Sequence, residues 1–181
     1  MIDLSPKCVK KISFEIPGDP QQKRSSQPNA IKRGDKWVGK SRPHKKNAPV
    51  AANIMECAYL AGWPRNAVPH AGPVMLKVQA FFKIRSADSN SWKKELYETE
   101  KIFHTSTPDI DRIINQVQDS LKGIIWGDDK QICKYIDPQK LYSLRPRTEV
   151  TIWLISNQMP GSNAEYKQMI TSAKINNGGT T

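Results

Sequence analysis

The acidic side chains of this chain are few, and those that could do chemistry lie close together. Asp109 and Asp111 stand at the expected start of a helix, Asp119 lies further along it, and Asp128 and Asp129 follow a glycine. Acidic residues bunched in this way either cap helices and turns or hold a metal ion. A single Asp at a helix start is explained by capping and by the helix dipole. Two carboxylates there repel each other, so capping alone does not explain the pair.

The chemistry that fits these residues is phosphodiester hydrolysis assisted by a metal ion. Carboxylates from a helix start and a nearby turn can converge only if a positive ion neutralises them, and Mg²⁺ prefers such oxygen ligands. A bound Mg²⁺ polarises a phosphoryl oxygen and lowers the pKa of the attacking water. Competing arrangements are missing, since the sequence has no GxxxxGK[ST] loop, no Ser-His-Asp or Cys-His pair, and no zinc-like spacing of His and Cys.

The charge of the chain favours a polyanionic partner. Its 181 residues include 28 Lys and Arg against 17 Asp and Glu, a formal net charge of +11. Between positions 23 and 46 the basic residues are Lys23, Arg24, Lys32, Arg33, Lys36, Lys40, Arg42, Lys45 and Lys46. The glycines and prolines of this stretch predict an exposed loop. It either binds the phosphates of a nucleic acid, with Trp37 stacking on a base or sugar, or is a solvated surface that keeps the protein soluble.

Hydrophobic spacing predicts the elements that position these residues. Strands are expected at residues 12–16, 74–83, 131–136 and 148–155. A helix is expected over residues 49–61, ended by Gly62. The helix behind the acidic pair opens at Thr107-Pro108, carries an apolar stripe and ends at Gly123. Residues 85–101 form either a short exposed helix or a flap. These elements predict a single α+β domain without fixing the order of its strands.

Composition also limits where the protein works. No apolar run approaches the ~20 residues of a membrane span, and residues 1–11 lack the apolar segment of a secretory signal. Three dispersed cysteines, an odd number, argue against a disulfide framework. We therefore expect a cytoplasmic protein with no membrane partner. Beyond residue 156 the polar composition predicts a loosely ordered tail over 157–181, with a helical turn near 164–170, behind a domain at 10–156.

The residues around the acidic pair resemble a known family. The run HTSTPDIDR at 104–112, continued by DSLKGIIWGDDKQI at 119–132, is similar to the signature of the RusA family of Holliday junction resolvases. That signature reads P-D-x-D-N-L-x-K, then D-A-L-x-G and W-x-D-D-x-Q-[IV]. Residues 14–18 resemble the first strand and turn of the family, and residues 146–152 resemble its closing strand, so the resemblance covers about 10–156.

The resemblance implies a small homodimeric nuclease, with a mixed sheet and two main helices, that cuts four-way DNA junctions using Mg²⁺ or Mn²⁺. Such proteins are frequently encoded by phages and prophages. By position, Asp109, Asp111 and Asp129 match the catalytic, metal-binding aspartates of the family, and Asp128 is then the turn residue. A two-fold junction needs two nicks, which two sites related by a two-fold axis would supply.

The chain departs from the family pattern at two helix positions. Arg112 stands where the family has Asn, and Asn115 stands where it has Lys. Positions three apart on a helix are neighbours, so Arg112 can supply the cation that Lys would give and is a predicted catalytic residue. If it does not, the protein binds junctions without cutting them. In a third interpretation it is a general nucleic-acid binder whose aspartates only cap.

Overall fold

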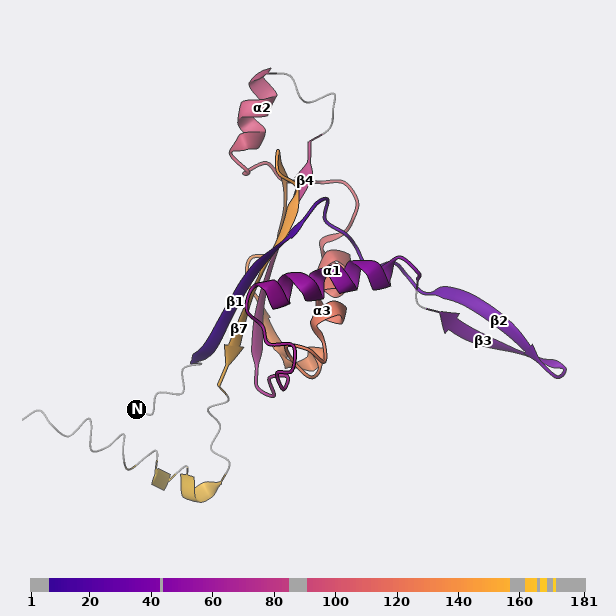
Figure 1. Ribbon diagram of the computed structural model, residues 1–181, viewed down its shortest axis with the longest axis vertical. Coiled ribbons are helices and arrows are strands. Elements are labelled where there is room, and N and C mark those ends of the chain that lie inside the picture. Colours follow the sequence, from indigo (N-terminus) through magenta and orange to yellow (C-terminus); the bar gives the residue numbers. More distant parts are fainter. Residues whose placement is uncertain are drawn as a thin grey trace, which may run out of the picture.

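The computed structural model describes residues 7–42, 44–84, 91–156, 162–165, 167–168 and 171. Its centre is a mixed sheet of five strands with two helices packed against it (Figure 1). The strands run in the order β1, β7, β4, β5, with β6 also paired to β4. Their bounds are β1 Cys8–Pro17, β7 Arg147–Ile155, β4 Val74–Lys83, β5 Ile132–Tyr135 and β6 Gln139–Ser143. The predicted α+β class with a small mixed sheet is confirmed.

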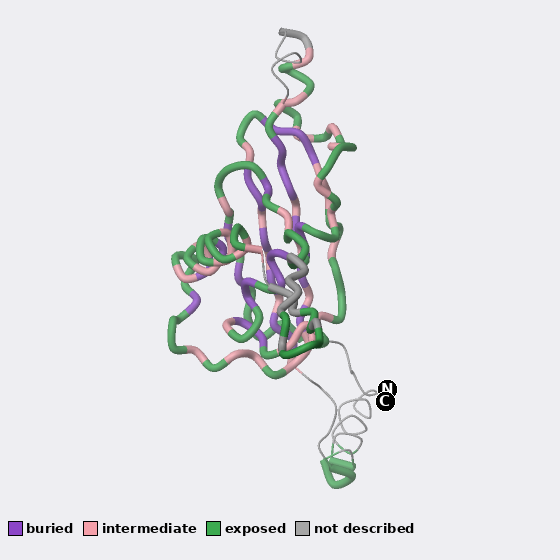
Figure 2. Tube along the Cα trace, turned by 90° about the vertical axis from the view of Figure 1, so that its right-hand side faces the viewer, coloured by how far each residue is buried: buried purple, intermediate pink, exposed green. Residues whose placement is uncertain are grey.

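The register of the paired strands places apolar residues on the same face of the sheet, where they form the core. β7 lies antiparallel between β1 and β4, and Ile12, Ile152 and Leu76 face one another across the three strands. All three are buried, because residues paired across strands share one face of the sheet. On the far side of β4, strands β5 and β6 pair with it in parallel. Buried residues therefore follow the central strands (Figure 2).

The two main helices, α1 Asn47–Leu60 and α3 Ile110–Leu121, cover this apolar face. From α1, Ile54 and Ala58 enter the core, and from α3 the apolar stripe does so. The members of that stripe, spaced as a helix requires, are Ile110, Ile113, Ile114, Val117 and Leu121. Gly62 and Gly123, at positive φ, follow the two helices as the sequence predicts.

The basic stretch is not a loop, so that expectation was wrong. It forms an antiparallel hairpin, β2 Gln27–Arg33 and β3 Lys36–Arg42, which extends away from the sheet and helices (Figure 1). Arg33 pairs with Lys36, so Gly34 and Asp35 make a two-residue turn with Gly34 at positive φ. Gly-Asp between extended runs is a hairpin signal, and solvated charges do not prevent strands from pairing.

Other differences from the sequence-based expectation are smaller. Strand β6, which follows Asp137-Pro138, was not predicted. The charged stretch contains a short helix, α2 Ser91–Glu98, while residues 85–90 lie outside the described part. Residues 163–165, 167–168 and 171 are helical, in line with the expected turn, but most of the 157–181 tail lies outside the described residues. Domain limits at 10–156 therefore stay a prediction. In the described part, no helix is long and apolar enough to cross a membrane.

Candidate active site

The acidic pair lies at the start of α3. Asp109 precedes the helix with extended backbone, φ −71° and ψ 145°, and its side chain makes no capping hydrogen bond. Its carboxylate is 66% exposed, and its Oδ2 lies 3.6 Å from Nε of Arg112. Asp111, in the first turn, is also exposed. Helix capping therefore does not explain Asp109, and its exposed carboxylate is available to bind a group outside the helix.

Lys140 of β6 fixes the backbone that leads into Asp109. Its ammonium group donates hydrogen bonds to the carbonyls of Ser106, at 2.6 Å, and Pro108, at 2.7 Å. The Thr107–Pro108 peptide bond between them is cis. Sequence reasoning missed Lys140, because a lysine in an unpredicted strand carries no signal that it will reach a helix start.

The second acidic segment is a turn built by Asp128. A short 3₁₀ helix, η2, spans Asp129–Gln131, and the carboxylate of Asp128 accepts a hydrogen bond from the backbone N–H of Lys130 at 3.1 Å. In return the Asp128 N–H donates to Oε1 of Gln131 at 2.8 Å. The Lys130 N–H is the main reason that the pKa of Asp128 is lowered. Asp128 is the turn residue, as the sequence indicates.

Gln131 anchors this turn to the body of the protein. Its side-chain amide donates to the carbonyls of His70 and Gly72, each at 2.8 Å. Gly72 has no room for a larger residue, because a Cβ there would lie 2.7 Å from the Ile155 carbonyl oxygen. The turn is thereby held against the edge where β4 begins.

Asp129 faces the end of α3. Its Oδ1 accepts a hydrogen bond from the indole N–H of the buried Trp126 at 3.3 Å, and its Oδ2 lies 3.4 Å from Nζ of Lys122. Lys122 also lies 3.6 Å from Oδ2 of Asp128. Desolvation would lower the pKa of Lys122, but the charges of Asp129 and Asp128 outweigh it, so the pKa is raised.

The structure brings these aspartates to two places. Asp109 and Asp111 share the start of α3, whereas Asp129 pairs with Lys122, which directly follows the helix. A twelve-residue helix is about 18 Å long at 1.5 Å per residue. Among the described residues no three His, Cys, Asp or Glu side chains are grouped as a metal site. The pair still suits Mg²⁺, which usually takes one or two carboxylates and completes its shell with waters and substrate phosphates.

The predicted DNA-binding residues spread over the hairpin and its two flanks. Lys23 and Arg24 precede β2, and Lys45 and Lys46 precede α1. With Lys32 and Lys36 these side chains are exposed, while those of Arg33, Lys40 and Arg42 lie outside the described part. All nine therefore belong to a segment that begins and ends beside α1 and α3.

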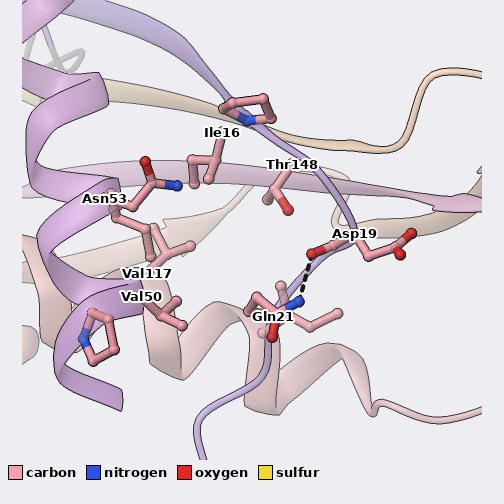
Figure 3. A pocket seen from close by; sticks show the side chains of 11 residues that line it. Ile16, Asp19, Gln21, Val50, Asn53, Val117 and Thr148 are labelled. Carbon is pink, nitrogen blue, oxygen red and sulfur yellow. Dashed lines mark hydrogen bonds between the residues drawn. The ribbon is translucent and has the colours of Figure 1, made fainter. Parts of the chain in front are cut away.

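An apolar hollow of about 240 Å³ lies where the end of β1 meets the two helices (Figure 3). Ile16, Val50 and Val117 contribute apolar walls, and the hydrogen bond from the Gln21 side chain to the Asp19 carbonyl, at 2.8 Å, crosses its rim. None of the predicted site residues lines it. The chain that rims it leads directly to Lys23 and Arg24.

Comparison with known families agrees with this fold. The family model of endodeoxyribonuclease RusA matches residues 55–153, which is more than half of the chain. The match contains α3, the η2 turn and strands β4 to β6, while β1, the hairpin and the first half of α1 lie outside it. No match was found among the curated proteins with which the chain was compared.

The chain therefore belongs to the RusA family of endodeoxyribonucleases, as the signature around Asp109 predicted. Family membership implies hydrolysis of DNA phosphodiesters, with Holliday junction DNA as the partner.

Proposed function

We propose that the protein is a homodimeric resolvase that depends on Mg²⁺ or Mn²⁺ and cuts four-way DNA junctions by paired nicks. The observation that carries this proposal is the acidic pair at the start of α3, where the exposed Asp109 carboxylate does no capping. Two acidic side chains next to a strongly basic segment suit a hydrolase that must bind both a cation and a polyanion.

In this proposal Asp109 and Asp111 hold the metal ion at the start of α3, whereas Asp129, the third aspartate that the resemblance assigns to the metal, lies at the other end of the helix. Bound by Asp109 and Asp111, the ion would polarise a phosphoryl oxygen and activate the attacking water. For Asp129 to bind a cation of its own, it must exchange its partner Lys122 for that cation, because the ammonium group lies against Oδ2 of its carboxylate. Arg112 is proposed to stabilise negative charge on the scissile phosphate, since its side chain is half exposed beside Asp109.

The hairpin and its flanks are proposed to bind the arms of the junction. A homodimer suits this substrate, because two sites related by a two-fold axis can each nick one strand of a two-fold junction. The free cysteines, Cys8, Cys57 and Cys133, agree with the proposed location in the reducing cytoplasm.

A second candidate is a junction-binding protein with little or no cleavage. It is favoured by two observations: Asn stands at position 115, where the family has a catalytic cation, and the half-exposed Arg112 lies 3.6 Å from Asp109. Such a protein would keep the basic surface and the affinity for branched DNA.

Strand-labelled four-way junction and linear duplex of the same sequence separate the two candidates. We expect nicks in two opposed strands of the junction with Mg²⁺, none with EDTA, and little cutting of the duplex. Tight junction binding without nicks in either Mg²⁺ or Mn²⁺ would favour the second candidate.

A further inference from the structure

A polar hollow lies directly beside the acidic pair. It measures about 250 Å³ and separates the segment before β2 from the first turns of α3. The residues that line it are Lys23, Arg24, Ser25, Ser26, Asp111, Arg112 and Asn115. Two guanidinium groups, one ammonium group, one amide and two hydroxyl groups thus surround a space that opens next to Asp111.

The wall that carries Arg24 is fixed by an amide clamp from α1. The N–H of Arg24 donates to Oδ1 of Asn47 at 3.0 Å, and the side-chain N–H₂ of Asn47 donates to the carbonyl of Arg24 at 3.0 Å. One residue earlier, the N–H of Lys23 donates to the carbonyl of Arg112 at 2.9 Å. Three hydrogen bonds therefore hold this exposed segment at a set position relative to both helices.

The cations of the hollow are not equivalent. Lys23 pairs with Asp119 at 2.5 Å, and Arg112 faces Asp109 at 3.6 Å, so each has a carboxylate near it. The Arg24 side chain is exposed, and within the described part of the chain no acidic group pairs with it. Arg24 is thus the cation of the hollow that is most available to an external anion.

The groups around the hollow define the anion that it suits. A guanidinium presents a planar fork of donors that matches two oxygens of a phosphate, and hydroxyl and amide groups add single hydrogen bonds. Asp111 forms part of the wall and repels a small free anion. The hollow therefore suits a phosphodiester of a strand that is already held by other contacts.

We propose that this hollow binds a DNA phosphodiester beside the cleavage site, with Arg24 contacting the phosphate and Asn47 acting as the positioning residue for Arg24. This inference rests on the proposed function and assigns it a specific phosphate site. Arg24 and Asn47 lie outside the range that matches the RusA family model, whereas Asp111, Arg112 and Asn115 on the other wall of the hollow lie inside it.

Four variants test the proposal: Arg24→Gln, Arg24→Lys, Asn47→Ala and the control Asn53→Ala. Asn53 is exposed on the same helix as Asn47 and lies away from the hollow. Junction affinity is measured in EDTA over a range of salt, so that binding is independent of cleavage, and nicking is measured separately in Mg²⁺. Thermal melting confirms that each variant is folded.

We expect Arg24→Gln to reduce the slope of log affinity against log salt by about 0.9 and the affinity at 0.1 M salt by about eightfold. Arg24→Lys should keep most of the salt slope, because the positive charge remains. It should nick more slowly, because an ammonium group does not reproduce the planar fork of donors that a guanidinium presents to a phosphate. Asn47→Ala should weaken binding although the arginine is still present, and Asn53→Ala should match the parent. If Asn47→Ala lowers stability because Asn47 is half-buried, the salt slope of Arg24→Gln still tests the phosphate site, since Arg24→Gln leaves the hydrogen bonds of Asn47 intact.

An unchanged slope and affinity in Arg24→Gln would overturn the phosphate site, and Asn47→Ala behaving like Asn53→Ala would overturn the clamp. Failure of the proposed function looks different: the parent would bind junctions with its full salt slope but nick nothing in Mg²⁺ or Mn²⁺. The affinities measured in EDTA would then still test the phosphate site, because they do not depend on cleavage.

Discussion

The ammonium group of Lys122 lies 3.4 Å from Oδ2 of Asp129, on the carboxylate that the sequence assigns to a metal ion. The indole N–H of Trp126 occupies the other oxygen at 3.3 Å. A metal ion that uses Asp129 must therefore compete with Lys122.

This competition gives the first prediction. Lys122→Gln should bind Mn²⁺ about two- to fivefold more tightly than the parent, the equivalent of one exposed ion pair. Calorimetric titration of Mn²⁺ measures the change, with the exposed Lys134→Gln as control. If Lys122→Gln binds Mn²⁺ like the parent and Asp129→Asn nicks at full rate, Asp129 is not part of the site.

The second prediction concerns Arg112 and Asn115 on α3, where the cation and the amide have changed places relative to the family pattern. Arg112→Ala should lower the nicking rate by roughly two orders of magnitude, the scale of removing one group that stabilises charge in the transition state. Asn115→Ala, three residues further along the helix, should cost much less. Single-turnover nicking of a junction at saturating protein compares the two. Equal rates for Arg112→Ala and the parent would move the catalytic cation elsewhere, first to Lys122 or Lys130.

The third prediction concerns the hairpin and its flank. Neutralising Lys32, Arg33, Lys45 and Lys46 to Gln should flatten the salt dependence of junction binding by up to about 0.9 log unit for each DNA phosphate that the variant no longer neutralises. Lys94→Gln, an exposed change on α2, serves as control. The same slope in the fourfold variant as in the parent would make the hairpin a solvated surface only.

Much of the fold could be predicted from sequence where burial dictates the pattern. The stripe of α3 and the alternation of β4 predict both elements because each has one side buried in the core. The hairpin was missed because its described side chains are exposed and show no apolar alternation, so that only the Gly34-Asp35 turn marks it. The order of the strands could not be predicted, because pairing between strands that are distant in the chain, such as β6 with β4, leaves no pattern in the local sequence.

For the site, residue types pointed to Asp109 and Asp111, but the supports around them could not be predicted. Lys140 reaches two carbonyls that lie more than thirty positions earlier in the chain, and Asn47 clamps Arg24 across the whole hairpin. Such contacts depend on the finished packing of β6 and α1. Residue types and spacing therefore indicate the groups that could do chemistry, but they do not indicate the side chains that position those groups.

The fourth prediction concerns stability in acid. Arg147, only 7% exposed, pairs with Glu100 at 2.7 Å and with Glu149 at 2.6 Å, and its guanidinium lies 3.8 Å above the ring of Phe81. The hydrogen bond from Arg147, more than that from Ser143, lowers the pKa of Glu100 from 4.5 to about 2. Because the pKa is lowered by folding, this ion pair stabilises the protein above pH 4.5, and the stabilisation is lost as the pH falls toward 2.

The loss should be on the order of 2 kcal/mol in the free energy of unfolding, discounted because the Glu100 side chain is 32% exposed. Urea unfolding of the parent and of Glu100→Gln at several values between about pH 2 and pH 6 measures it. Glu100→Gln should have a lower free energy of unfolding than the parent at the upper end of this pH range. Its free energy of unfolding should fall less than that of the parent as the pH is lowered. Part of the slope should remain, because Arg145 also lowers the pKa of Glu15. Parallel curves for the two proteins would contradict the assigned role of Glu100.

If Asp109 and Asp111 form the metal-dependent centre that cuts DNA, removing either charge must slow cleavage. The decisive measurement is the nicking rate of a strand-labelled four-way junction, at saturating protein in Mg²⁺, for the parent, Asp109→Asn and Asp111→Asn. Each substitution keeps the shape and removes the charge, so both variants should bind the junction in EDTA at least as well as the parent. Both should nick it more slowly by about a hundredfold or more. Nicking at the parental rate by either variant would contradict the account.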